Sequence, residues 1–135
     1  MLFKHMTVKD QMMSNDEQQP NWLFNQDNKN QGIVRQLTTG ISARIFVGDK
    51  SMLSIVHVEP HTEGKLHNHP EEQWGFLLEG ECIRIQNGKR VSVRKGDFWH
   101  TPSNVQHGIR SEEQAAVVLE FFSPSRLEYR SEVKK

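Results

Sequence analysis

Two histidines and a glutamine, set close together, are the residues of this chain whose types and spacing fit metal chemistry. The stretch "KLHNHPEEQWGFLLEG" (65–80) holds His67 and His69 one residue apart, with Gln73 four positions later. Alternate side chains of an extended strand share one face, so these three groups would point the same way. Neutral imidazole is a common ligand of zinc, iron, nickel, copper and manganese. The spacing therefore indicates one side of a metal site, or else an unusually polar strand end.

A further ligand is expected from His107. The stretch "GDFWHTPSNVQHG" (96–108) places this histidine after a glycine turn and a proline, at the start of a strand that can pair near the first. Asn104 stands where a left-handed backbone would be useful, and asparagine tolerates that conformation better than most residues. We expect one divalent ion (zinc, nickel, manganese or iron), whose identity the ligand types do not fix. The expected ligands are His67, His69, Gln73 and His107.

Two glutamates beside Gln73 are alternative ligands. Glu71 shares the parity of His69 but directly follows a proline. Glu72 has the opposite parity unless a bulge shifts it, so the facing argument favours Gln73. Its neutral amide would leave the full double charge on a divalent ion, which makes the ion a stronger Lewis acid and a better partner for an anion. The same neutrality disfavours cycling to a higher oxidation state.

The elements that must position these groups are short β-strands. From Ile33 onward, runs rich in β-branched and aromatic residues alternate with turn residues, which is typical of an antiparallel barrel or sandwich. Asn87-Gly88 is a strong hairpin signal, because both turn residues need a positive φ. The sequence therefore predicts an all-β domain. The expected strands lie within residues 32–37, 41–48, 52–60, 73–80, 81–86, 91–97, 105–109 and 115–122.

Three parts are expected along the chain. Residues 1–32 are rich in Gln, Asn and Asp and form an irregular, polar N-terminal arm with one apolar cluster, Trp22 to Phe24. Residues 33–123 form a single barrel. Residues 124–135 form a C-terminal tail that makes a short helix at most.

Length and composition restrict the class of protein. A chain of 135 residues makes one ordinary domain with a real core. The 17 basic and 17 acidic residues balance, so the clustered positive charge of a nucleic-acid-binding protein is not expected. No apolar stretch approaches the roughly 20 residues of a membrane helix. The first ten residues have no hydrophobic signal segment, which predicts a cytoplasmic location. The single cysteine, Cys82, excludes an internal disulfide and is expected in the core.

Glu120 interrupts a strand that is otherwise apolar on both faces, "AAVVLEFFSP" (115–124). Burying a carboxylate is unfavourable unless it has a partner. If Glu120 and Phe122 face the barrel interior, that partner would be the metal site or a substrate hydroxyl. The alternative is a glutamate at the strand end that pairs with an arginine, either Arg126 or Arg110.

The stretch around His67 resembles the first motif of the cupin superfamily, G-x5-H-x-H-x3-E-x6-G. Three positions match the motif: His67, His69 and Gly80. Two positions depart from it, since Gln73 stands where the glutamate is expected and His61 where the leading glycine is expected.

The stretch around His107 resembles the second cupin motif, G-x5-P-x-G-x2-H-x3-N. Its matching positions are Gly96, Pro102 and His107. Asn104 replaces the inner glycine and Ser111 the final asparagine. Together the two resemblances imply a cupin-type barrel (a double-stranded β-helix, similar to a jelly roll) that has kept its three metal-binding histidines.

A narrower resemblance links the chain to the small cupins that linearise unsaturated uronates released from pectin and alginate. The segments that carry it are "HNHPEEQ" (67–73) and "LEFFSPSR" (119–126). In that family the glutamine is a metal ligand, and an Asp-x-Phe-Ser-Pro-x-Arg run carries residues needed for activity. By position, the resemblance implies catalytic roles for Glu120, Phe122 and Arg126. Glu120 replaces the family's aspartate, so the carboxylate is kept but reaches one methylene further.

These resemblances imply a metal-dependent enzyme, of isomerase or lyase type, that acts on a small anionic, sugar-derived substrate in carbohydrate metabolism. Glu120 would move a proton as general acid or base, and Arg126 would pair with a substrate carboxylate. Phe122 would shape the pocket. Two other classes remain open: an iron- or nickel-dependent dioxygenase, which the neutral Gln73 disfavours, and a non-catalytic cupin that binds a small ligand.

Outward-facing apolar residues predict a homodimer. Trp74, Phe76 and Leu78 would line the strand face opposite Gln73, and a lone barrel would leave this patch uncovered. Trp99 is expected to serve packing or subunit contact. The remaining strand and loop histidines are expected at the rim or surface: His57, His61 and His100.

Overall fold

The structure is a computed structural model that describes residues 20–126 and residue 128. Contacts divide the chain into two units, Met1–Gln31 and Gly32–Lys135, which are described separately. The C-terminal tail, for which the sequence predicts a short helix at most, lies largely outside the described residues. Among those that are described, no helix combines the length and the hydropathy that crossing a bilayer requires.

The described part of the first unit, residues 20–31, is a series of turns. Asparagine side chains close two of them: Oδ1 of Asn25 accepts a hydrogen bond from the backbone N–H of Asp27, at 2.8 Å, and Oδ1 of Asn28 accepts one from the backbone N–H of Asn30, at 3.0 Å. Such side-chain bonds compete with helix and strand formation. This part of the arm is therefore irregular, as the sequence predicts.

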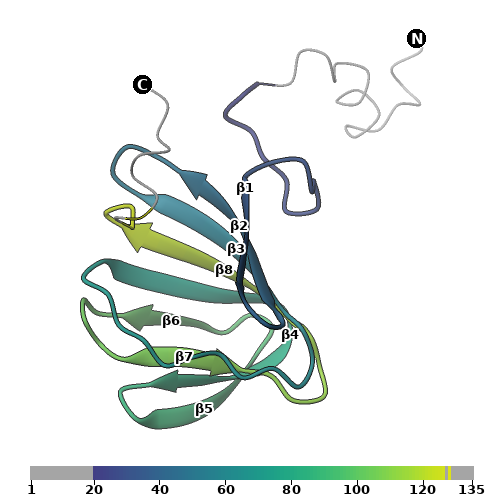
Figure 1. Ribbon diagram of the computed structural model, residues 1–135, viewed down its shortest axis with the longest axis vertical. Helices are drawn as coiled ribbons and strands as arrows, with labels where there is room; N and C mark the ends of the chain where they lie inside the picture. Colours follow the sequence, from purple (N-terminus) through teal and green to yellow (C-terminus); the bar gives the residue numbers. More distant parts are fainter. Residues whose placement is uncertain (1–19, 127, 129–135) are drawn as a thin grey trace. The chain divides into compact units, whose positions relative to one another are not determined.

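Eight strands, all paired antiparallel, make up the second unit (Figure 1). Buried residues alternate with exposed ones along the first half of the strand Glu72–Gln86, which is the period of a half-buried strand. The all-β prediction is confirmed. The strands are β1 (Ile33–Thr38), β2 (Ile41–Val47), β3 (Met52–Val58), β4 (Glu72–Gln86), β5 (Lys89–Arg94), β6 (Phe98–Thr101), β7 (His107–Arg110) and β8 (Ala116–Ser123).

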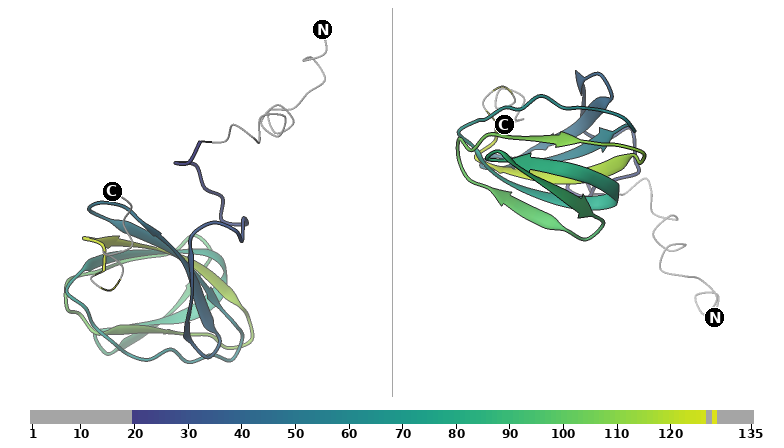
Figure 2. Two further views of the ribbon diagram at one scale, coloured as in Figure 1. Left: turned by 45° about the horizontal axis from the view of Figure 1, so that its top comes forward. Right: turned by 90° about the horizontal axis from the view of Figure 1, so that it is seen from below.

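The long strand β4 connects the two sheets of the barrel. Its first half pairs with β8 on one side and β6 on the other, and its second half pairs with β5 and β7. The strands β1, β2, β3, β8, β4 and β6 thus form one sheet, and β4 continues into a second sheet with β5 and β7. Figure 2 shows these strands curled round one interior. Residues from both sheets can therefore meet inside the barrel.

A bulge and a glycine turn β4 from one sheet into the other. The register with β8 shifts between Leu77 and Glu79, and Gly80 has a φ of 84°. A Cβ at Gly80 would lie 2.0 Å from the carbonyl oxygen of Ala115, so only glycine fits at this corner. The prediction of two separate strands that meet at Gly80 was wrong, because the bulge bends the strand without ending it.

The turns follow local chemistry closely. Asn87 and Gly88 both have positive φ, 51° and 80°, which confirms the predicted hairpin between β4 and β5. Asn104 also adopts the left-handed conformation expected for it, with φ of 64°. Strand β6 is absent from the predicted set, because four residues are too few to show a period.

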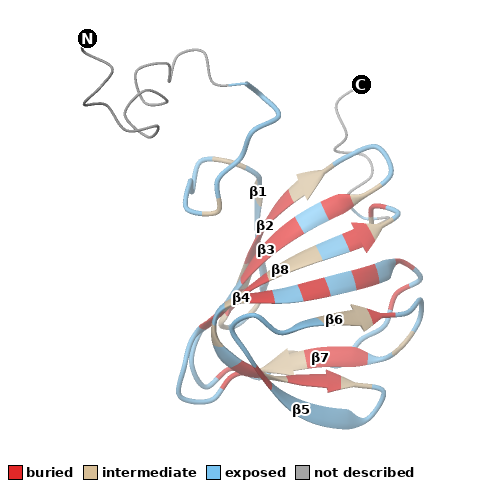
Figure 3. Cartoon of the chain, turned by 180° about the vertical axis from the view of Figure 1, so that it is seen from behind, coloured by how far each residue is buried: buried red, intermediate tan, exposed pale blue. Residues whose placement is uncertain are grey.

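The core fills the space between the sheets. Inward and outward residues alternate along the first half of β4 (Figure 3), where Leu77 is fully buried. Cys82 is buried as predicted, and burial raises the pKa of its thiol to about 11. The other buried apolar residues of this core are Ile41, Ala43, Ile45, Met52, Val56, Val58, Val93, Ala116, Val118 and Phe122.

Large apolar side chains occupy the outer face of the first sheet, as the alternation predicts. Trp74 is 44% exposed and Phe76 is 39% exposed, and Phe98 packs its ring against that of Phe76. Leu78 is half-buried, because the bulge shifts its direction. The homodimer that this face suggests stays a prediction.

Candidate metal centre

The metal-site histidines come from two segments that the backbone ties together. His67 and His69 lie in an extended segment just before β4, whereas His107 begins β7. The backbone N–H of His67 donates to the carbonyl of His107 at 2.9 Å, and the N–H of His107 donates back to His67 at 2.8 Å. This reciprocal pair holds the two segments in register and brings three imidazoles to one place.

Each imidazole is fixed in the same tautomer by a carbonyl two residues away. Nδ1 of His67 lies 3.0 Å from the carbonyl oxygen of Lys65, that of His69 lies 3.0 Å from Glu71, and that of His107 lies 2.8 Å from Val105. A carbonyl only accepts, so each Nδ1 carries the proton and donates it. Each Nε2 then keeps its lone pair free for a cation.

The free nitrogens converge. One ligand atom from each of the three histidines lies within 4.8 Å of the others. Nε2 of His107 is buried and has no hydrogen-bond partner, which is unfavourable unless something else satisfies it. These residues therefore fit a metal ion, and among the described residues no other group of histidine, cysteine or acidic side chains converges in this way.

The surroundings of His69 and His107 favour the neutral imidazole, which is the form that binds metal. Burial, reinforced by the nearby Arg84, lowers the pKa of His107 to about 3, although the bond to the Val105 carbonyl opposes the shift. Burial is also the main cause that lowers the pKa of His69, and the charge of Arg126 adds to it. Neither ring needs to lose a proton before a cation enters at neutral pH.

Gln73 faces the histidines, as the strand parity predicts. Its side chain is 1% exposed, and Oε1 lies 3.0 Å from Nε2 of His69. Its amide nitrogen donates to Oε2 of Glu120 at 2.5 Å. Since a carboxylate oxygen accepts, this bond fixes the amide so that its carbonyl oxygen points toward the imidazoles. Two electron-pair donors then face each other, and a shared cation would satisfy both.

The two alternative glutamates point elsewhere. Glu71 is buried behind His69, where its Oε1 lies 3.5 Å from Nδ1, on the side of the ring away from the free nitrogen. Glu72 faces outward and pairs with His100 at 2.5 Å. The geometry therefore agrees with the choice of Gln73 as the fourth candidate ligand.

Glu120 faces the barrel interior from β8. Burial raises the pKa of its carboxyl group, against the lowering effect of Arg84, His67 and Arg126. The alternative placement, an ion pair with Arg126 or Arg110, does not occur among the described residues, because the direct partner of Glu120 is Gln73. The carboxylate thus contacts a candidate metal ligand directly.

A cavity of about 300 Å³ opens beside the histidines. Phe122 forms part of its wall, with its ring centroid 5.5 Å from that of His69. The guanidinium of Arg126 lies over the same phenyl ring, 5.8 Å from its centroid, and is paired with Glu128 at 3.0 Å. The apolar lining residues are Leu37, Ile41, Val56, Ile109, Val118 and Phe122.

Arg84 also lines this cavity, and sequence reasoning missed it. The side chain is 5% exposed and lies on the second half of β4. The signal that would have found it is the one used for Glu120, a charge on a strand face shared with a core residue. Arg84 shares parity with the buried Cys82.

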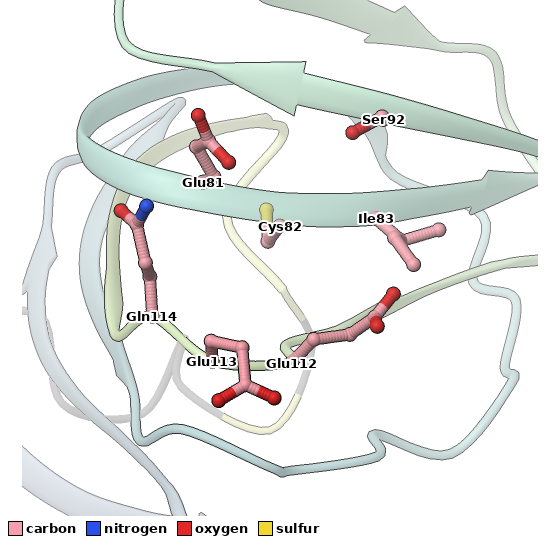
Figure 4. Close-up of a pocket in the computed structure, with 7 residues that line it drawn as sticks. All are labelled: Glu81, Cys82, Ile83, Ser92, Glu112, Glu113 and Gln114. Atoms are coloured by element: carbon pink, nitrogen blue, oxygen red, sulfur yellow. The ribbon is translucent and has the colours of Figure 1, made fainter.

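A second cavity, of about 330 Å³, lies beside Cys82 and carries no histidine (Figure 4). Three carboxylates line it, from Glu81, Glu112 and Glu113. They do not form a converging group comparable to the three imidazoles in the described structure.

A family model described as a cupin domain matches residues 54–122, which is half of the chain. The chain belongs to the cupin family. Both motif stretches lie within the matched residues, so the family assignment and the convergence of the three histidines concern the same part of the barrel.

Two known proteins that are similar to this chain, one in sequence and one in fold, are both named KdgF. The pectin degradation protein KdgF of Dickeya dadantii (strain 3937) is 27% identical over 96 residues, which are 70% of this chain and 87% of that protein. The structure of KdgF from a Halomonas species has a TM-score of 0.67 at 22% identity, over 74% of this chain and 93% of that one. An RmlC-like cupin from Shewanella frigidimarina NCIMB 400 gives a TM-score of 0.68 at 22% identity, over 75% and 91%. The two structural likenesses show the fold.

Proposed function

We propose that this chain is a metal-dependent cupin enzyme that opens the ring of a small unsaturated uronate. The observation that carries the proposal is the convergence of three imidazoles, with an unpartnered buried Nε2 on His107, next to a cavity that holds a carboxylate. The similarity to a pectin degradation protein supports the choice of a sugar acid as substrate.

The ion would be held by the three histidines and Gln73. When bound, a divalent cation would supply a Lewis acid and a positive charge for an anionic oxygen. Gln73 contributes no charge of its own, so the positive charge available to a substrate is larger than with a glutamate in its place. The proposed ligands are His67, His69, Gln73 and His107.

The proposed reaction is an isomerisation without redox change. A proton leaves the anomeric hydroxyl, the bond from the anomeric carbon to the ring oxygen breaks to give an aldehyde and an enolate, and the enolate takes up one proton at carbon to become a ketone. Glu120 lines the cavity and is the one carboxylate among the described residues that does so, so its oxygens would accept and return the proton. No atom is gained or lost.

Binding and exclusion of water fall to two residues near the end of β8. Arg126 would attract the anionic substrate to the cavity opening through its positive charge. Phe122 is 3% exposed and would keep water from the histidine side of the bound sugar. Val56 and Val118 extend the same apolar wall.

The test is an absorbance assay on the purified protein, loaded with zinc, nickel, manganese or iron in turn. Loss of the conjugated double bond of an unsaturated monouronate, without oxygen, is the expected result. The variant H67A/H69A should show no such loss above the spontaneous rate. Equal rates for the two proteins would refute the proposal.

The same assay separates the two alternative classes. A dioxygenase would consume oxygen and would stop under nitrogen. A binding cupin would hold the uronate without changing its absorbance, and Glu120→Gln would then alter affinity only.

A further inference from the structure

Arg84 is a buried cation with incomplete hydrogen bonding. Nη2 donates to the hydroxyl of Thr101 at 2.8 Å, and Nε and Nη2 make longer contacts of 3.4 Å with the side-chain oxygen of Gln86. Both partners are neutral. Across the described part of the chain, no carboxylate lies at ion-pair distance from Arg84, and Nη1 has no hydrogen-bond acceptor.

The guanidinium is held firmly all the same. It lies over the ring of Trp99, 5.3 Å from the centroid. Thr101 donates in turn to Gln86 at 2.7 Å, and the amide of Gln86 donates to the carbonyl of His100 at 2.8 Å. One edge of the guanidinium is therefore fixed by the protein, and Nη1 remains available. A donor held in place in this way loses little freedom when a ligand binds.

The charges around the metal-site cavity favour an anion. Three cationic side chains and one carboxylate line it, before any divalent ion is added: Lys65, Arg84, Arg126 and Glu120. Arg126 already has a carboxylate partner in Glu128. Arg84 has no carboxylate at ion-pair distance among the described residues, and feels the charge of Glu120 only from further away. A buried guanidinium is unfavourable until an anion completes its surroundings.

We propose that Arg84 determines substrate specificity by binding the carboxylate of the substrate inside the barrel, through Nη1. The inference rests on the proposed function, since it takes a sugar acid as the substrate. Arg84 would bind the substrate carboxylate within the barrel, whereas Arg126 would act at the opening of the cavity. The preference for an acid over the corresponding neutral sugar then depends on Arg84.

A purely structural role for Arg84 makes a different prediction. The contacts with Thr101 and Trp99 join the second half of β4 to β6, so a strut at this position would stabilise the barrel without affecting ligand choice. Arg84 also borders a third, separate cavity, whose lining includes Lys89 and Asp97. The experiment must therefore measure selectivity and location, in addition to stability.

The first measurement is calorimetric titration of the zinc-loaded protein with D-galacturonate and with D-galactose, which differ at the carboxylate. We expect the wild type to prefer the acid, and Arg84→Met to lower that preference roughly 10- to 100-fold. The zinc content should stay unchanged. Arg44→Met removes a buried arginine that lies outside this cavity and should keep the preference.

The outcomes separate this inference from the proposed function. If the wild type prefers galacturonate and Arg84→Met prefers it equally, the inference is wrong and the proposed function stands. If the wild type shows no preference for the acid, both the choice of a sugar acid and the role of Arg84 are overturned.

A second measurement needs no variant, in case Arg84→Met does not fold. Galacturonate is titrated into the zinc-loaded wild type while the arginine side-chain and imidazole resonances are followed by NMR. We expect shifts of the Arg84 guanidinium together with the ring of His107. Shifts confined to Arg126, or to Lys89 and Asp97 with the imidazoles unchanged, would contradict the inference.

Discussion

Two cavities of the described structure have similar volumes, about 300 and 330 Å³, but their linings differ in kind. The first cavity lies beside three imidazoles whose Nε2 atoms converge. The second has three carboxylates, from Glu81, Glu112 and Glu113, that do not converge (Figure 4). Acidic side chains are common metal ligands, yet number and type alone do not make a site. Backbone bonds that fix tautomer and direction distinguish the first cavity from the second.

The largest effect is expected from removing two imidazoles. The variant H67A/H69A should reduce bound metal to background after loading and dialysis, because Gln73 and His107 alone are too few ligands for a stable site. Elemental analysis gives the metal-to-protein ratio. The matched control, E112A/E113A, alters the other cavity and should bind as much metal as the wild type. Loss of metal in the control would end the distinction between the cavities.

The next effect concerns proton transfer. Glu120→Gln should slow turnover of an unsaturated monouronate by roughly 10²- to 10⁴-fold at saturating metal, as expected for loss of a general acid or base. Glu113→Gln makes the same chemical change in the second cavity and should leave the rate within about twofold of the wild type. Rates are measured by absorbance, and a normal rate for Glu120→Gln would remove this residue from the mechanism.

A smaller effect is expected on acid stability. The pKa of His107 is about 3 in the folded, metal-free protein and lies near 6.5 when the chain is unfolded. The unfolded state therefore binds the extra proton between these values, so stability falls as the pH drops below about 6.5 and keeps falling toward 3. The limiting slope for one proton is about 1.4 kcal/mol per pH unit.

Urea unfolding of the metal-free protein at a series of pH values measures this slope. His107→Gln should flatten it, since the replaced side chain does not titrate. Glu113→Gln serves as the control and should keep the steeper dependence of the wild type. Parallel curves for His107→Gln and the wild type would show that His107 contributes nothing to it.

The smallest effect concerns the second cavity. With a pKa of about 11, only roughly one Cys82 thiol in a thousand is ionised at pH 8, and its side chain is buried. A thiol reagent should therefore label the native protein no faster than the protein unfolds. Ser92→Cys in a Cys82→Ser background places a thiol at an exposed position of the same cavity and should react rapidly. Rapid labelling of Cys82 itself would reveal a reactive site there.

Features with a local cause were predictable from the sequence. Asn87 and Gly88 specify their own turn, and parity alone placed Gln73 toward the interior. The apolar neighbours of Glu120 showed that its carboxylate needs a partner, without showing which one. Each of these inferences depends only on neighbouring residues in the sequence and on the alternation of side chains along one strand.

Features that depend on distant contacts were not predictable. The continuity of β4 depends on a bulge and on the space beside the Ala115 carbonyl, neither of which a strand pattern reveals. Two kinds of partner stayed open for Glu120, the metal site or substrate on one side and an arginine on the other, and the strand pattern could not choose between them; the structure places the amide of Gln73 there. Arg84 escaped notice because its neighbours Thr101 and Trp99 belong to β6, which was itself unrecognised.

The reciprocal backbone bonds between His67 and His107 have a consequence for assembly. Bringing these two positions together closes a long loop, which reduces the conformational entropy of the chain. This loop is already closed when the barrel has folded. A cation that arrives afterwards finds its donors already gathered, so uptake should need little rearrangement. Chelation should accordingly leave a folded barrel with a lower melting temperature, and adding the ion back should restore the original value without a refolding step.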